Sequence, residues 1–342
     1  MRVVELRKHG SPEEAFVIAE RQLPSVGPAD VKIRVKAFGI NFADVLCRLG
    51  FYPDCPPLPK VIGYEVSGRV DAVGREISHV KPGDRVIAMT RFGGYAEEVV
   101  TPGKAVMKVP DWVSDVDAAA LPINGLTAYH CLAEMVKIRK GDRVLIQAAA
   151  GGVGTLAVQL AKHFGAEVFG TCSSQEKVEH LRKIGVDHPI NYLEKDYETE
   201  IKRLASGKRL DIILDSLAGP NIPKEFGLLR AGGRLVVFGV AAAMGSRGKS
   251  WPKMIWTFIR AKRFMALELL MASKAIIGVN MLKVADQRPD LAAAEMLELF
   301  DLYQKGVVKP YISETFKLED VPKAHHLLQS RKSIGKIVIT TD

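Results

Sequence analysis

The chain has 342 residues, of which 47% are hydrophobic, 25% charged and 7% aromatic. At about 150 residues per domain this length predicts two domains, and the composition excludes disordered, collagen-like and disulfide-scaffold proteins. The net charge of +9 comes largely from residues 245–263, which hold basic residues and no acid. An excess confined to one segment disfavours nucleic acid as a partner.

Residues 1–8 alternate apolar and charged side chains, which predicts a strand rather than a secretory signal. The longest uncharged stretch, residues 144–161, contains clustered glycines and is not expected to span a membrane. The four cysteines are scattered, as is typical of proteins in reducing compartments. We therefore expect a cytoplasmic location, with peripheral attachment to membranes as the alternative.

Residues 1 to about 120 contain short apolar runs that are interrupted by Gly and Pro turns. Such a pattern indicates short strands that close into a small β-barrel. The expected strands are residues 31–37, 61–73, 85–89 and 95–100.

From about residue 125, apolar runs of strand length alternate with helical patterns, which is typical of βαβ units around a buried parallel sheet. The order predicts a doubly wound α/β domain. A helix over residues 321–329 and a strand over 336–340 then follow, and we expect this tail to return to the first domain. The expected strands of the α/β domain are residues 144–147, 167–171, 189–192, 212–215 and 233–239.

A glycine-rich loop follows the first of these strands and precedes a helix expected over residues 155–164. Its spacing matches the dinucleotide fingerprint G-x-G-x-x-G, with alanine in the first position. The glycines would allow close approach of a pyrophosphate to the backbone at the helix N-terminus. A tight strand-to-helix turn without a ligand is the alternative. The loop residues are Ala149, Gly151, Gly152, Val153 and Gly154.

The second strand of the α/β domain ends in hydroxyl residues rather than in the acid that holds the ribose of NAD. Ser173 and Lys177 follow this strand, and they would suit the 2′-phosphate of NADP. Glu176 is more simply a partner for the helix dipole, and Lys177 could equally be a solvated helix charge. The sequence favours NADPH as the cofactor.

Together these motifs resemble the medium-chain dehydrogenase/reductase superfamily, and within it the zinc-less, zeta-crystallin-like quinone oxidoreductases and their vesicle amine transport protein homologue branch. The resemblance implies a GroES-like β-barrel domain over residues 1–124 and 281–342, a Rossmann domain over 125–280, and a homodimer. It rests on Gly39-Ile40-Asn41-Phe42-Ala43-Asp44, Gly50-Phe51-Tyr52-Pro53, Gly63-Tyr64-Glu65-Val66-Ser67-Gly68, Gly125-Leu126-Thr127-Ala128-Tyr129 and Gly335-Lys336-Ile337-Val338.

The resemblance also allows a comparison with the zinc ligands of related enzymes. The corresponding positions hold Asn41, Tyr64 and a residue near Asn124, and none of these is an ordinary zinc ligand. The cysteines lack the close Cys-x-x-Cys spacing of a structural zinc site. We therefore expect no metal.

By the same resemblance, Asn41 would lie beside the nicotinamide, and Tyr52 would donate a hydrogen bond to the developing oxyanion. Each also has a plainer interpretation, as a turn residue or an ordinary aromatic. For Tyr192 a core position at a strand end is an equal alternative. The further cofactor residues that the resemblance implies are Thr127, Tyr192, Phe238, Gly239, Val279, Asn280 and Lys332, with Lys336 as an alternative to Lys332.

Without a metal, the substrate has to be electrophilic already, so the expected reaction is hydride transfer from NADPH to a quinone or an α,β-unsaturated carbonyl. The basic segment supports a rival hypothesis. Residues 249–271 combine aromatic and aliphatic residues with lysines and arginines, and a basic amphipathic helix can bind an anionic membrane surface or phospholipid. The plainer interpretation of this segment is a lid or interface helix.

Overall fold

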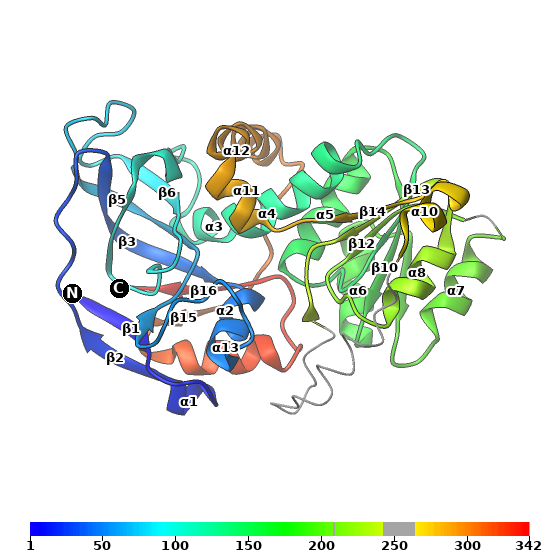
Figure 1. The fold of residues 1–342 in the computed structure, drawn as a ribbon, viewed down its shortest axis with the longest axis horizontal. Helices are drawn as coiled ribbons and strands as arrows, with labels where there is room; N and C mark the ends of the chain where they lie inside the picture. Colours follow the sequence, from blue (N-terminus) through cyan, green and yellow to red (C-terminus); the bar gives the residue numbers. More distant parts are fainter. Residues whose placement is uncertain (208, 242–263, 342) are drawn as a thin grey trace. The chain divides into compact units, whose positions relative to one another are not determined.

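The structure is a computed structural model that describes residues 1–207, 209–241 and 264–341. The chain folds into two compact units (Figure 1). Of the basic segment expected to form an amphipathic helix, residues 249–263 lie outside the described part. The first unit comprises Met1–Leu126, Leu282–Leu297 and Pro310–Asp342, and the second comprises Thr127–Met281 and Glu298–Lys309.

Residues 298–309 belong to the second unit although they were expected in the first, and the other bounds differ from the expected ones by one or two residues. Helix α12 (Pro289–Gln304) runs from the first unit into the second, and its last turns bury Leu299 and Phe300. The division also falls within two more helices, α4 (Pro122–Tyr129) and α11 (Met281–Gln287). Among the described residues, none of the helices combines the length and apolar character that a membrane span needs.

The first unit is a β-rich body with a hydrophobic interior. A sheet in the order β15-β16-β3-β5-β6-β8, with β7 also paired to β3, packs with a smaller sheet in the order β2-β1-β4. Its elements are β1 (Arg2–Leu6), α1 (Pro12–Ala15), β2 (Phe16–Glu20), β3 (Asp30–Ile40), α2 (Phe42–Leu49), β4 (Lys60–Val61), β5 (Glu65–Val73), β6 (Arg85–Met89), β7 (Glu98–Pro102), η1 (Gly103–Ala105), β8 (Val106–Lys108), α3 (Asp115–Ala120), β15 (Ile312–Lys317), η4 (Leu318–Asp320), α13 (Val321–Gln329) and β16 (Lys336–Thr340).

The C-terminal tail completes this first unit, as the sequence predicted. Strand β16 pairs antiparallel with β3, and Ile337 lies opposite Ile40. Lys336 is thereby brought beside Asn41, although the two residues are 295 positions apart in the chain. The register therefore places a lysine next to a candidate catalytic residue.

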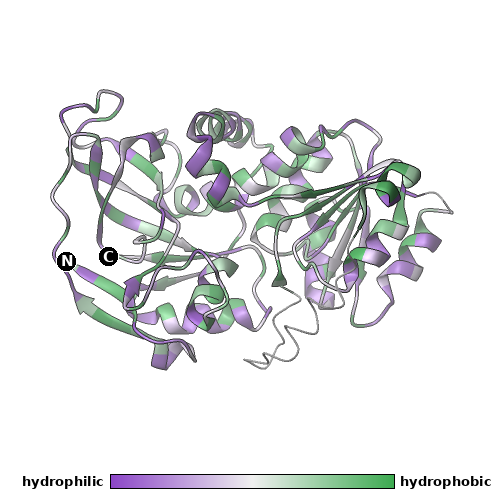
Figure 2. Ribbon diagram, viewed as in Figure 1, coloured by the Kyte–Doolittle hydropathy of each residue, from purple (hydrophilic) through white to green (hydrophobic). Residues whose placement is uncertain are grey.

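The second unit is a doubly wound α/β domain, which confirms the predicted fold class. Its strands are all parallel, in the order β11-β10-β9-β12-β13-β14. Its helices carry both hydrophobic and hydrophilic residues, as expected for helices with one face on a sheet (Figure 2). The elements are the π-helix η2 (His130–Met135), β9 (Arg143–Ile146), α5 (Gly152–His163), β10 (Glu167–Cys172), α6 (Gln175–Lys183), β11 (His188–Asn191), α7 (Tyr197–Leu204), β12 (Leu210–Asp215), α8 (Asn221–Leu228), β13 (Leu229–Val237), α10 (Ala266–Ala272) and β14 (Ala275–Gly278).

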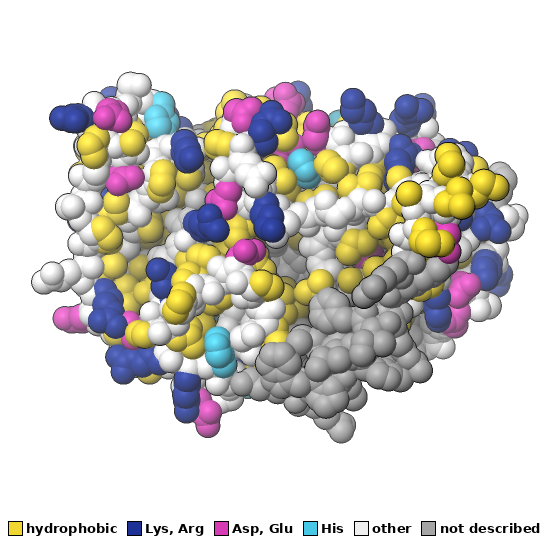
Figure 3. All heavy atoms as spheres, viewed as in Figure 1, with side chains coloured by type: hydrophobic (Ala, Val, Ile, Leu, Met, Phe, Trp, Pro, Cys, Tyr) yellow, Lys and Arg dark blue, Asp and Glu magenta, His cyan; other side chains and the backbone are white. Residues whose placement is uncertain are grey.

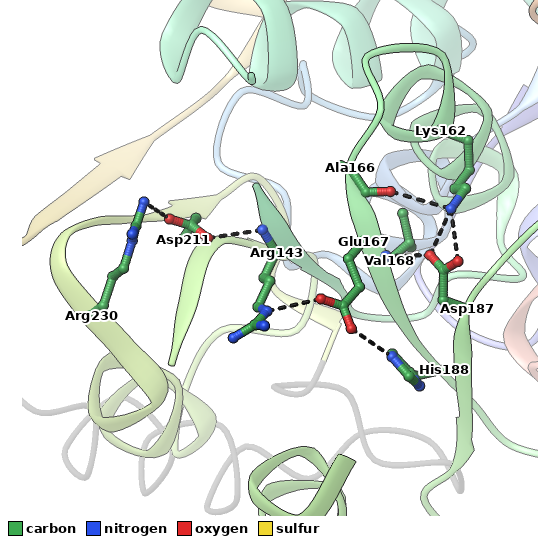
Figure 4. Close-up of polar contacts among 9 residues, drawn as sticks. All are labelled: Arg143, Lys162, Ala166, Glu167, Val168, Asp187, His188, Asp211 and Arg230. Carbon is green, nitrogen blue, oxygen red and sulfur yellow. Dashed lines mark hydrogen bonds and ion pairs between the residues drawn. The ribbon is translucent and has the colours of Figure 1, made fainter. Parts of the chain in front are cut away.

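The strand order reverses between β9 and β12. In open parallel sheets, ligands bind outside the carboxyl ends of the strands at such a switch point. The opposite, amino-terminal edge is closed by polar contacts between neighbouring strands (Figure 4). Glu167 accepts from Arg143 and from His188 at 2.8 Å each, and Asp211 accepts from the backbone N–H of Arg143 at 2.9 Å. A ligand site is therefore expected at the carboxyl edge of the sheet.

Several predicted elements have other bounds. The strand expected over residues 61–73 is divided into β4 and β5, and the strand expected from Gly233 begins at Leu229. The helix expected from Thr155 starts at Gly152, because Gly151 takes the extended conformation of a cap residue and the next two glycines belong to the first turn. The strand expected from Tyr95 starts at Glu98. The backbone of Tyr95 bonds instead to Ile62, at 2.9 Å.

Candidate cofactor site and catalytic residues

The glycine-rich loop joins β9 to α5 at the switch point. Ala148 has a φ of +50°, and the Gly151 N–H donates to the Ala148 carbonyl at 2.9 Å, which closes a tight turn. A Cβ added to Gly154 would lie 2.5 Å from the carbonyl oxygen of Ala148 and 2.6 Å from that of Ala149. Because both contacts are to backbone atoms, position 154 requires glycine.

The N-terminus of α5 presents free donors at this loop. The first bond of the helix type runs from the Thr155 N–H to the Gly151 carbonyl, at 2.9 Å. The N–H groups of Gly152, Val153 and Gly154 therefore precede the first intrahelical bond. Together with the positive end of the helix dipole, such groups attract phosphate. The loop has the local geometry that a pyrophosphate needs.

The residues expected at the 2′-phosphate lie after β10 and β11. The Ser174 hydroxyl caps helix α6 by accepting from the Lys177 N–H at 3.3 Å. The Tyr192 N–H donates to the Cys172 carbonyl at 3.0 Å, which holds the ends of the two strands together. Ser173 and Tyr192 are half-buried, whereas the Lys177 side chain is only 8% exposed.

The next two strands end at the same edge of the sheet. A Cβ on Gly239 would lie 2.5 Å from the carbonyl oxygen of Ser216, so the loops after β12 and β13 approach each other closely. The Val279 N–H donates to the Val237 carbonyl at 2.9 Å, which fixes the start of the loop after β14. The loops after β13 and β14 hold four of the predicted cofactor residues, Phe238, Gly239, Val279 and Asn280.

The remaining cofactor predictions lie elsewhere. Thr127 is buried within α4 in the second unit, and Lys332 is exposed in the first unit, in the segment before β16. The alternative prediction, in which Lys336 instead of Lys332 contacts the cofactor phosphates, is wrong. Its side chain is 3% exposed, and its ammonium group is held by Asn41 and Glu65.

Asn41 lies at the centre of a buried polar cluster in the first unit. Its Oδ1 accepts from the Lys336 ammonium at 2.6 Å, and its Nδ2 donates to Glu65 Oε1 at 2.8 Å. Lys336 also donates to Glu65 at 2.5 Å, and the second Glu65 oxygen accepts from the Ile123 N–H at 2.7 Å. The amide of Asn41 is thereby fixed in orientation, and one of its two Nδ2 hydrogens remains for another acceptor.

Asp44 lies in the first turn of helix α2, next to this cluster. Its carboxylate accepts from the Asn41 N–H at 2.8 Å, so the acid braces the turn that carries Asn41. The side chain is completely buried, and burial raises its pKa to about 7, against the opposing effects of that hydrogen bond and of the Lys336 charge. The Asp44 carboxyl group therefore serves the local structure.

Tyr52 is half-buried in the segment after α2 and packs edge-on against Tyr64, with ring centroids 6.1 Å apart. Burial raises the pKa of Tyr52 to about 12. The phenol is thus a hydrogen-bond donor throughout the neutral range. The Tyr64 hydroxyl lies 3.4 Å from Cys47 Sγ.

The residues at the expected zinc positions do not fit a metal. The Asn41 oxygen already binds the Lys336 ammonium, whose charge would repel a divalent cation. Tyr64 is 4% exposed and packs against Phe92, with ring centroids 5.1 Å apart. Within the described ranges, no group of three or more His, Cys, Asp and Glu side chains is arranged to hold a metal ion.

Sequence reasoning missed the partners of the predicted residues. Glu65 was recognised only as part of a motif and Lys336 only as an alternative to Lys332, and Gln147, Asp215 and Glu225 were given no role. A polar residue directly after an apolar strand was an available signal for Gln147 and Asp215. For Glu225, in the middle of an amphipathic helix, the sequence offers no comparable signal.

Comparison with known proteins identifies two sequence families. Residues 27–111 match the alcohol dehydrogenase GroES-like domain, and residues 152–296 match a family described as zinc-binding dehydrogenase. The human synaptic vesicle membrane protein VAT-1 homolog is 37% identical over 92% of this chain and 80% of its own length. A 2-haloacrylate reductase from Burkholderia is 32% identical over 98% of this chain and 97% of its own.

Among solved structures, the quinone oxidoreductase of Escherichia coli in complex with NADPH has a TM-score of 0.88 to this chain. The two are 29% identical, and the match covers 100% of each chain. These likenesses confirm the predicted combination of a GroES-like domain with a Rossmann-type parallel sheet.

Proposed function

This chain belongs to the medium-chain dehydrogenase/reductase superfamily, in its quinone oxidoreductase family and VAT-1 branch, and on that premise we propose that it reduces quinones or α,β-unsaturated carbonyls with NADPH. The observation that carries the proposal is the glycine-rich loop at the switch point of the parallel sheet, with Gly154 pressed against two carbonyl oxygens. The E. coli relative, solved with NADPH, and the Burkholderia reductase support the same class of reaction.

The second unit supplies the residues that would hold the cofactor. The N–H groups at the start of α5 would bind the pyrophosphate, and Ser173 and Lys177 would contact the 2′-phosphate. Tyr192 and Phe238 would border the adenosine, while Val279 and Asn280 would offer backbone groups to the carboxamide. NADPH, when bound, supplies the hydride.

The first unit supplies the proposed catalytic residues. No step can be assigned to a metal here, because the donor set around Asn41 already holds an ammonium group. Negative charge that develops on the substrate oxygen then has to be met by hydrogen-bond donors. Tyr52 offers a phenol that stays protonated, and Asn41 offers its remaining N–H. A conjugated substrate suits such weak donors, because it spreads the charge over several atoms.

The direct test is steady-state oxidation of NADPH with a naphthoquinone, an alkenal and a simple ketone. We expect turnover of the quinone or the alkenal and none of the ketone, because only conjugated substrates are activated without a Lewis acid. Equal turnover of the ketone would contradict the proposal, and so would a failure to reduce any of the three.

Replacing Tyr52 with phenylalanine should lower kcat by about 100-fold, the usual contribution of a positioned proton donor, and should leave KM nearly unchanged. The ring packing against Tyr64 is retained, so thermal stability should not change. Tyr311→Phe, at an exposed tyrosine of the same unit, is the control. An unchanged kcat in Tyr52→Phe would show that the phenol does not act in the reaction.

Replacing Ser173 with aspartate should reverse the cofactor preference. A carboxylate at this strand end would repel the 2′-phosphate, and like charges in contact cost several kcal/mol. We expect the Kd for NADPH to rise by about 100-fold, whereas the Kd for NADH changes little. Titration of both cofactors into the variant and into Ser173→Ala measures the ratio. An unchanged ratio would place the 2′-phosphate elsewhere.

We further propose that the chain forms a homodimer through the sheet edge at β14. This strand is the last in the sheet order, and exposed edge strands commonly pair with another chain. Hydrophobic side chains gather over the neighbouring helix α10 (Figure 3), where Leu270 is 73% and Met271 80% exposed. Light scattering should give twice the chain mass, and a monomer at micromolar concentration would contradict the proposal.

The exposed side chains of α10 also bear on the membrane hypothesis, because they belong to the end of the 249–271 segment. The VAT-1 relatives are named as vesicle membrane proteins. Flotation with anionic vesicles separates the two roles. A dimer that floats with the vesicles supports membrane binding as a second function. A dimer that remains in the bottom fraction supports the interface alone.

A further inference from the structure

Buried, hydrogen-bonded polar side chains connect the glycine-rich loop with helix α8. The Ala148 N–H donates to the Thr171 hydroxyl at 3.2 Å, and this hydroxyl donates to Gln147 Oε1 at 2.6 Å. Gln147 Nε2 then donates to Glu225 Oε1 at 2.8 Å. The three side chains are at most 2% exposed. Glu225, on α8, is thus linked through two side chains to the loop that follows β9.

Glu225 also reaches the loop on the other side of the switch point. Its carboxyl group interacts with that of Asp215, the last residue of β12. Asp215 in turn accepts from the N–H groups of Leu217 at 2.6 Å and Ala218 at 3.0 Å. Ala218 has a φ of +56°, so the loop after β12 depends on these bonds for its shape.

Two buried carboxyl groups in contact must share a proton. Asp215 receives two backbone donors, which favour its charged form, whereas Glu225 Oε2 receives no donor from the part of the chain that the structure describes. Glu225 is therefore the proton donor of the pair. Burial and the neighbouring Asp215 charge raise the pKa of Glu225 to about 9, which leaves it neutral at physiological pH.

The other elements around Glu225 bring few charges near it. Helix α7 contributes the phenol of Tyr197. Burial raises the pKa of Tyr197, and so do the neighbouring Glu225 and Asp215. Lys224, on α8 itself, lies over the Tyr197 ring and 3.9 Å from Asp196 at the surface.

The arginines of β13 are engaged at the other end of the sheet. Arg230 pairs with Asp211, and Arg234 pairs with Asp142. No cation from this strand therefore compensates the two carboxylates.

We propose that Glu225, in its protonated form, is a positioning residue that holds the loops after β9 and β12 in the arrangement that binds the cofactor. This inference rests on the proposed function, because NADPH binding is the property that it governs. Loss of the proton would place two charges side by side in the core. The bond to Asp215 would then break, and both loops would lose their common support.

The test is the Kd for NADPH as a function of pH, in the wild-type protein and in Glu225→Gln. Glutamine keeps both hydrogen bonds, because its oxygen accepts from Gln147 and its amide donates to Asp215. We expect equal Kd values at neutral pH. Above about pH 9 the wild-type Kd should rise by about tenfold relative to that of the variant. Glu198→Gln, on the surface of α7, is the control and should follow the wild type.

Two further variants complete the test. Asp215→Asn places an amide donor opposite Glu225. With this substitution present, the proteins with Glu225 and with Glu225→Gln should therefore have equal Kd values for NADPH at high pH. Glu225→Leu leaves the Gln147 amide unpaired and should raise the Kd by about tenfold at every pH. A wild-type-to-Glu225→Gln ratio that stays constant with pH would overturn the inference alone. A wild-type protein that binds no NADPH at neutral pH would overturn the proposed function as well.

Discussion

Gly154→Ala should weaken NADPH binding by about 10- to 100-fold. The added methyl group would meet the carbonyl oxygens of Ala148 and Ala149 at 2.5 Å and 2.6 Å, and relieving such overlap costs about 1–3 kcal/mol. The carbonyls belong to the turn whose N–H groups are proposed to bind the pyrophosphate. Displacing them therefore acts on the cofactor site itself, as isothermal titration with NADPH would measure.

A matched control exists in the same unit. Gly227 lies in helix α8, and a Cβ built there meets no atom within 4 Å. Gly227→Ala should bind NADPH as the wild type does and should gain up to about 1 kcal/mol of stability from helix propensity. Equal Kd values for Gly154→Ala and Gly227→Ala would contradict the assignment of the loop.

Lys336→Met should lower the free energy of unfolding by about 3–5 kcal/mol, because it leaves the Glu65 carboxylate buried without its cation. The side chains of Lys336 and Glu65 are 3% and 0% exposed, and their ion pair also holds the Asn41 amide. Urea denaturation measures the loss. The variant should in addition lose activity, since Asn41 is no longer fixed.

Two comparisons separate this effect from a general loss of charge. Lys305 forms an exposed pair with Asp301, and Lys305→Met should change stability by less than about 1 kcal/mol. Adding Glu65→Gln to Lys336→Met removes the unpaired charge and should restore much of the lost stability. If Lys336→Met were no less stable than Lys305→Met, the buried ion pair would not support the first unit.

Much of the fold could be predicted because period and turn chemistry are local properties. Strands β6 and β16 and helix α13 have the predicted bounds. Glycine misled the prediction at α5, where the fingerprint was assigned to a loop although Gly152 already begins the helix. The apolar pattern runs without a break from Tyr95, whose backbone bonds to Ile62, into strand β7, which begins at Glu98. The pattern alone therefore did not locate the start of β7.

The candidate site was less predictable, because its polar partners meet only in the folded chain. The resemblance implied Lys336 as an alternative to Lys332 in the cofactor site, yet the register of β16 against β3 buries it beside Asn41. Glu225 reaches Gln147 only because α8 packs against the sheet near the end of β9. Neither the residue type nor the spacing contains this information.

Hydride transfer from NADPH to a conjugated carbonyl can be followed with an isotopic label. The protein is incubated with an α,β-unsaturated carbonyl and NADPH in which both C4 hydrogens of the nicotinamide are deuterium, and the product is analysed by mass spectrometry. We expect a saturated carbonyl with deuterium on its β-carbon. A product without deuterium, or no reduced product from any conjugated carbonyl while NADPH is bound, would contradict it.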